Sequence, residues 1–116
     1  MAKLTDAQRE TFEALRRTYL AEVPSRIAAI RDAVTEAGRP ETSRAALEKL
    51  RHLVHQLVGS SAIFGLPLVS AAAQALGDLV KGLLEGAAPG AGELDRLTGA
   101  LERTWTESAA PRESKG

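Results

Sequence analysis

Residues 43–66, SRAALEKLRHLVHQLVGSSAIFGL, decide the fold of this chain. Apolar residues recur in this stretch at intervals of three and four, which is the period of a helix with one buried face. The side chains on that face are Leu47, Leu50, Val54, Leu57 and Ser61, with Leu53 and Phe64 on its flank. Thr42 or Ser43 is the predicted start of the helix. Gly65 and Pro67 are the predicted stop, because glycine supplies a left-handed cap and proline does not continue a helix.

A longer helix is predicted before this stretch. It begins at Thr5, where residues 5–8 fit a capping box, and it ends at Gly38 and Pro40. Its apolar stripe consists of Phe12, Leu15, Tyr19, Val23, Ile27, Ile30 and Val34. Pro24 interrupts the stripe and removes one backbone donor. Because the stripe resumes in phase, we expect a kink at Pro24 rather than a break.

Two further helices are predicted after the central stretch. The third runs from about Pro67 to Glu85, with Val69, Ala72, Ala73, Leu76, Leu79, Val80 and Leu83 inward. A flexible glycine-rich turn, 86–92, precedes the fourth helix, whose inward residues are Leu94, Leu97, Leu101 and Trp105. The pattern predicts an all-α, up-down-up-down four-helix bundle over residues 1–108, with a long, proline-kinked first helix. Residues 109–116 are expected to form a disordered tail.

The composition supports this fold and excludes several functions. Alanine and leucine contribute 37 residues, whereas valine and isoleucine contribute 9, so helix formers dominate. The absence of cysteine excludes disulfides and thiol chemistry. The 15 basic and 15 acidic residues form no single-sign block, which argues against a nucleic-acid partner. We find no membrane-spanning run and no signal peptide, and we expect a cytoplasmic protein without a membrane partner.

The outward side of the central helix carries residues that a plain bundle does not require. His55 lies roughly 130° from the centre of the apolar face, with Arg51 and His52 one turn before it. Gly59, one turn after it, costs the helix about 0.5–1 kcal/mol relative to alanine. Because their side chains are absent or small, Gly59 and Ala62 would leave open space beside the imidazole. The alternatives are a solvated surface histidine, and a glycine that marks a loose helix end or permits a bend.

The segment from His55 to Leu66 resembles the signature of the histidine-containing phosphotransfer (HPt) domain family. The family pattern is a histidine, a leucine two positions later, a lysine at the third position, a glycine at the fourth, small residues, and a second glycine at the tenth. The positions that match are His55, Leu57, Gly59, Ser60, Ser61 and Gly65. The predicted order of helices also resembles the family.

The resemblance implies a phosphorelay intermediate. Nε2 of His55 would accept a phosphoryl group from the aspartate of one receiver domain and pass it to another. The implied partners are receiver domains of response regulators and hybrid sensor kinases, and we expect a monomer. No cofactor is implied for this chain, because the receiver would supply Mg²⁺, and no nucleotide-binding element suggests autokinase activity. The docking contacts would be Val58, Gly59, Ala62, Leu66 and part of the first helix.

The chain departs from the family at two positions. Val58 replaces the lysine that helps to hold the phosphoryl oxygens, and Gly77 replaces a glutamine that lies near the imidazole in several members. Substitutes are available in Arg51, Gln74 and Lys81. Two of them, Gln74 and Lys81, belong to the third helix. Helical spacing places them on one polar stripe, formed by Ser70, Gln74, Gly77 and Lys81. If this stripe borders the central helix, Gln74 could orient the ring and Lys81 could pair with phosphate; otherwise it is a solvated face.

Three other functions remain open at this point. The departures at Val58 and Gly77 favour a module that binds or sequesters a receiver and transfers phosphate poorly. A metal site is another alternative, because Glu48, His52 and His55 follow one another at helical spacing. Bundles usually gather metal ligands on inward faces, however, and these histidines point outward. We therefore predict no metal. A purely structural bundle leaves the glycine beside the histidine unexplained. His52 is expected to tune local charge rather than to accept phosphate.

Overall fold

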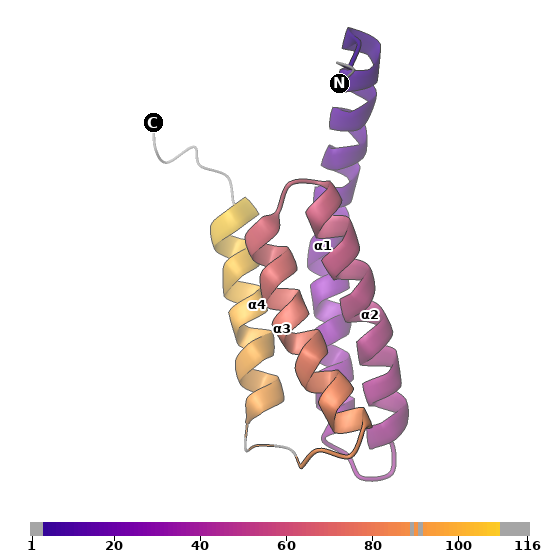
Figure 1. Cartoon of the computed structure of the whole chain (residues 1–116), viewed down its shortest axis with the longest axis vertical. Coiled ribbons are helices and arrows are strands. Elements are labelled where there is room, and N and C mark those ends of the chain that lie inside the picture. Colours follow the sequence, from indigo (N-terminus) through magenta and orange to yellow (C-terminus); the bar gives the residue numbers. More distant parts are fainter. Residues whose placement is uncertain (1–3, 89, 91, 110–116) are drawn as a thin grey trace.

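Four helices, each antiparallel to the one before it, form the part of the chain that the computed structural model describes, residues 4–88, 90 and 92–109 (Figure 1). They are α1 (Asp6–Ala37), α2 (Ser43–Ile63), α3 (Pro67–Leu84) and α4 (Glu93–Ala109). The predicted all-α, up-down-up-down bundle is therefore confirmed. Ala109, predicted to begin the tail, is the last residue of α4, and residues 110–116 lie outside the described residues. None of these helices is both long and apolar enough to span a bilayer.

Local signals in the sequence fix the helix ends. At the start of α1, the Thr5 hydroxyl accepts from the Gln8 amide at 3.0 Å and the Gln8 side chain accepts from the Thr5 amide at 2.8 Å, which completes the predicted capping box. At the end of α2, Gly65 adopts φ +78° and the Leu66 amide donates to the Ser61 carbonyl at 2.8 Å. This geometry satisfies the last carbonyls of α2 and turns the chain into α3.

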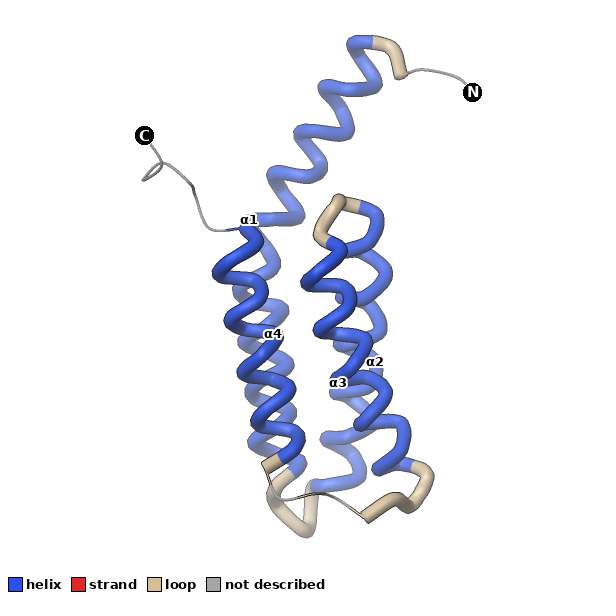
Figure 2. The backbone as a smooth tube through the Cα atoms, turned by 60° about the vertical axis from the view of Figure 1, so that its left-hand side comes forward, coloured by secondary structure: helices blue, strands red, loops and turns tan. Residues whose placement is uncertain are grey.

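Helix α1 is continuous through Pro24, and its first turns project beyond the rest of the bundle (Figure 1). In Figure 2 these turns lean away from the direction of the remaining helix, as expected for a kinked rather than a broken helix. Phe12 is 37% exposed and Leu15 is 55% exposed, so the first two positions of the predicted stripe lie outside the core. The reason is length, since 32 residues span about 48 Å and the 21 of α2 about 32 Å.

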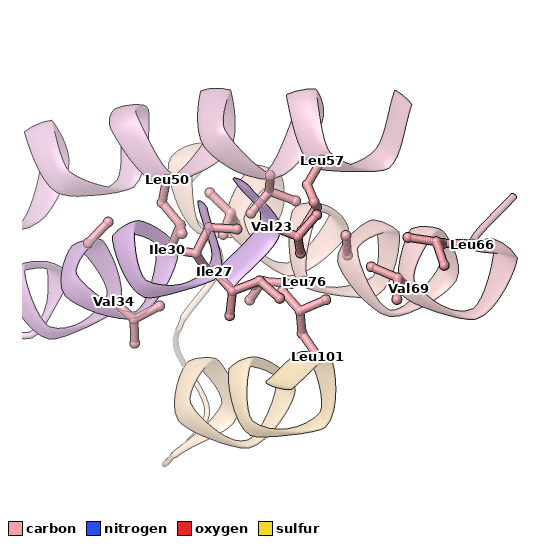
Figure 3. Close-up of a cluster of buried hydrophobic side chains, with 14 of the residues drawn as sticks. Val23, Ile27, Ile30, Val34, Leu50, Leu57, Leu66, Val69, Leu76 and Leu101 are labelled. Atoms are coloured by element: carbon pink, nitrogen blue, oxygen red, sulfur yellow. The ribbon is translucent and has the colours of Figure 1, made fainter. Parts of the chain in front are cut away.

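The core of the bundle is built from aliphatic side chains of all four helices (Figure 3). The large side chains that are fully buried are Val23, Ile30, Leu50, Val54, Leu57, Val69, Leu76, Val80 and Leu101. Two buried polar residues have their hydroxyls satisfied. Ser61 pairs with the Tyr19 hydroxyl at 3.0 Å, and Thr98 donates to the Leu94 carbonyl at 2.7 Å. From Tyr19 onward the predicted inward residues are buried in this core or pack against it, except Leu79 and Leu83, which are half-buried and lie outside it.

An ion-pair cluster joins α1 to α4 at the edge of this core. The guanidinium of Arg31 donates two hydrogen bonds to the carboxylate of Glu102, at 2.7 and 3.1 Å, and also pairs with Asp95. The hydrogen bonds that Arg31 donates to Glu102 lower the pKa of Glu102 and raise the pKa of Arg31. Paired, two-point contacts of this kind are stronger than single surface ion pairs.

We predict that Glu102→Gln destabilises the bundle by about 0.5–1 kcal/mol at neutral pH, a value reduced for the partial exposure of the pair. Because folding lowers the pKa of Glu102 from its ordinary 4.5, this contribution is present above that pH and is lost as the pH falls through the folded value. Urea unfolding at neutral pH and near pH 3 measures the difference. Glu13→Gln, on an exposed part of α1, is the control. An equal loss in both variants, or a loss independent of pH, would contradict the prediction.

Candidate functional site

His55 lies on the exposed face of α2, as its place in the helical period predicts. Within the described part of the chain, its ring forms no hydrogen bond and no ion pair. The imidazole is therefore free to meet a reactant from solvent. Arg51 and His52, one turn before it, are also exposed.

The packing of α2 against α3 determines what lies beside His55. A Cβ atom at Gly77 would stand 3.2 Å from Cγ1 of Val54, which is closer than ordinary van der Waals contact. Gly77 therefore allows the two helices to approach closely. The hydroxyl of Ser70 also joins them, since it donates to the Val58 carbonyl at 2.9 Å. Because Ser70 and Gly77 both face α2, the polar stripe of α3 borders the helix that carries His55.

A cleft between these two helices contains the imidazole. Its lining residues are Arg51, Val54, His55, Val58, Gln74, Gly77, Asp78 and Lys81. The structure thus gathers beside His55 the three predicted substitutes, Arg51, Gln74 and Lys81. Neither Arg51 nor Lys81 pairs with a carboxylate among the described residues. Two cationic side chains therefore remain available to an anion bound in the cleft.

The side chain of Gln74 has a different partner from the one predicted. Its amide nitrogen donates to a carboxylate oxygen of Asp78 at 3.0 Å, and no hydrogen bond joins it to His55. Sequence reasoning did not single out Asp78. Its position four residues after Gln74 and three before Lys81 was the available signal, since such residues share one helix face. The cleft therefore holds one acidic group beside its two cations.

His55 also lines a second cleft, which is formed by α2 alone. It is lined by Glu48, Arg51, His52 and His55. The described residues contain no group of three or more His, Cys, Asp or Glu side chains placed to hold a metal ion. Arg51 stands among these side chains and would repel a cation. The metal-site alternative therefore has no geometric support here.

The predicted docking residues differ in their exposure. Gly59 and Ala62 are exposed, and Val58 is half-buried. The prediction for Leu66 was wrong, because it is only 4% exposed: the turn after Gly65 directs its side chain into the core, where it packs. Two apolar residues that the sequence analysis did not select are prominent instead, with Ile63 68% and Leu68 67% exposed. Both lie next to the α2–α3 turn, at helical positions that do not belong to the buried faces.

Helix α1 anchors the end of α2 that follows His55. The Tyr19 hydroxyl lies 2.7 Å from the hydroxyl of Ser60 and 3.0 Å from that of Ser61. The Phe64 ring stacks on the Tyr19 ring with centroids 4.7 Å apart, and the guanidinium of Arg16 donates to the Phe64 carbonyl at 2.8 Å. The small serines of the motif thus have a structural task, which is to bind α1 and to hold the histidine helix in place.

Comparison with known proteins agrees with this geometry. The family model described as Hpt domain matches residues 14–107, which is more than half of the chain. A search of curated proteins and a search of solved structures each returned no match. The match includes the whole of α2 and α3, and therefore every residue that lines the His55 cleft.

Two glycines beside the site should respond oppositely to alanine. An added Cβ at Gly59 meets no atom within 4 Å, so Gly59→Ala should stabilise the bundle by about 0.5–1 kcal/mol through helix propensity. Gly77→Ala should give no such gain, because the buried Val54 would have to move. Urea unfolding of both variants measures the contrast. A gain at Gly77 as large as that at Gly59 would show that the α2–α3 contact is not tight.

Proposed function

Because the chain belongs to the Hpt domain family, whose members are phosphotransfer modules of two-component signalling, we propose that it is a phosphorelay intermediate. His55 accepts a phosphoryl group from the aspartate of one receiver domain and passes it to the aspartate of another. The observation that carries this proposal is the exposed imidazole, which has no hydrogen-bond or ion-pair partner among the described residues and shares a cleft with Arg51 and Lys81.

The chemistry follows from the neutral form of the imidazole. The lone pair of Nε2 attacks the phosphorus atom of the aspartyl phosphate. An N–P bond forms, the bond between phosphorus and the aspartate oxygen breaks, and the carboxylate leaves with the electron pair. The proton on Nδ1 stays on the ring or passes to solvent. The second transfer runs this step in reverse on a second receiver.

The two cations of the cleft take the place of the family lysine. Charge on the phosphoryl oxygens is stabilised by positioned positive groups, and Arg51 and Lys81 approach the imidazole from α2 and α3 respectively. The Mg²⁺ ion belongs to the partner receiver in this proposal. The chain itself is loaded by transfer rather than by its own kinase activity, and therefore stays unlabelled when it is incubated with ATP alone.

The phosphoacceptor is tested by histidine replacement. Incubation with Mg²⁺ and a panel of receivers charged by acetyl phosphate should place an acid-labile, base-stable label on the wild type. His55→Gln should abolish the label, because the nucleophile is lost, and His52→Gln should keep most of it. Label that survives His55→Gln, or no label across the full panel, would contradict the proposal.

The role of the two cations is tested separately. Arg51→Ala and Lys81→Ala should each slow the initial rate of labelling by about 3- to 10-fold, since each removes one positive charge from the cleft. Lys49→Ala removes an exposed cation of α2 that lies outside the cleft, and it should leave the rate unchanged. The same loss in all three variants would point to net charge rather than to the cleft.

One alternative has its own support. Val58 and the Gln74–Asp78 hydrogen bond leave the cleft poorer in phosphate donors than the family pattern provides. A module that binds receivers without efficient transfer is consistent with this. Binding of a receiver without labelling, together with a gain of labelling in Val58→Lys, would favour the alternative.

A further inference from the structure

We propose that Asp78 sets the balance of phosphoryl transfer at His55, by disfavouring the phosphorylated form of this chain and so favouring transfer onward to a receiver. This inference rests on the proposed function and concerns the same cleft. Its basis is the position of one carboxylate among the side chains that surround the imidazole.

Asp78 lines the cleft and has one hydrogen-bond partner there. The Gln74 amide donates to one of its oxygens at 3.0 Å, one helical turn away on α3. The close approach of α2 and α3 at Gly77 brings this turn of α3 against the turn of α2 that carries His55. Asp78 is therefore an exposed carboxylate on the side of the bundle that carries the imidazole.

The charge of Asp78 is not cancelled by an ion pair within the described part of the chain. Arg51 and Lys81 line the same cleft without pairing with it. A phosphoryl group brings about two negative charges at neutral pH. Two cations can balance that group, and the carboxylate then adds one uncompensated negative charge nearby. A like charge at this position raises the free energy of the phosphorylated state relative to that of the unphosphorylated state, in which the cleft holds no phosphoryl charge.

The replacement of the family lysine by Val58 acts in the same direction. Val58 lines the cleft and contributes no positive charge where the family pattern has one. Both features lower the capacity of this chain to retain a phosphoryl group. The equilibrium therefore favours transfer of the phosphoryl group to a receiver over its storage on this chain.

The test compares equilibria rather than rates. The chain is mixed with the receiver that labels the wild type fastest, and the ratio of phosphorylated chain to phosphorylated receiver is measured at equilibrium. Asp78→Asn keeps an oxygen that can accept from Gln74 but removes the charge. It should raise the ratio about 3- to 10-fold at low salt, and high salt should reduce this effect.

Two variants separate charge from structure. Gln74→Leu removes the hydrogen bond and keeps the charge, so it should shift the ratio less than Asp78→Asn does. Asp32→Asn, on the exposed face of α1 and outside the cleft, is the matched charge control and should leave the ratio unchanged.

The outcomes distinguish this inference from the proposed function. A labelled wild type with an unchanged ratio in Asp78→Asn overturns the inference alone. An equal shift in Gln74→Leu or in Asp32→Asn does the same, because the effect would then come from the hydrogen bond or from net charge. Absence of label from both the wild type and Asp78→Asn overturns the inference together with the proposed function.

Discussion

The close contact between α2 and α3 at Gly77 is the constraint on which the site depends. A side chain at this position would press on Val54, which is fully buried and has little room to move. The missing side chain brings the polar stripe of α3 next to the histidine helix, and it is the reason that Lys81 and Asp78 share a cleft with His55. Gly77, which departs from the family pattern, therefore has a packing role. Where several family members have a glutamine side chain, this chain has a close contact between two helices.

Helix α2 performs two tasks with its two faces. Its inward face supplies three fully buried aliphatic side chains, Leu50, Val54 and Leu57, and these hold it in the core. Within the part of the chain that the structure describes, its outward face leaves the imidazole without a hydrogen-bond partner and the space over Gly59 open. The anchoring of the helix end by α1 completes this division, because it holds α2 in place while its outward face stays open. The buried face of α2 and its contacts with α1 thus support an open surface around His55.

The sequence was sufficient for the fold and for the exposed position of His55, since both follow from helical periodicity and from the helix start and stop signals at Thr5, Gly65 and Pro67. It was insufficient where a side chain's direction depends on tertiary geometry. Leu66 is buried because of the turn that follows α2, and Gln74 donates to Asp78 rather than to the imidazole. Helical spacing placed the polar stripe correctly, but spacing alone does not say which members of a stripe pair with each other.

The most direct test of the central claim is to locate the phosphoryl group. The chain is loaded by a phosphorylated receiver, kept at alkaline pH to preserve N–P bonds, and mapped by fragmentation mass spectrometry, with ³¹P NMR to identify the bonded atom. The prediction is a single phosphoryl group on His55, bonded to Nε2. A phosphoryl group on His52 or on a hydroxyl side chain, or an unmodified chain after exposure to receivers that bind it, would contradict the assignment of His55 as the phosphoacceptor.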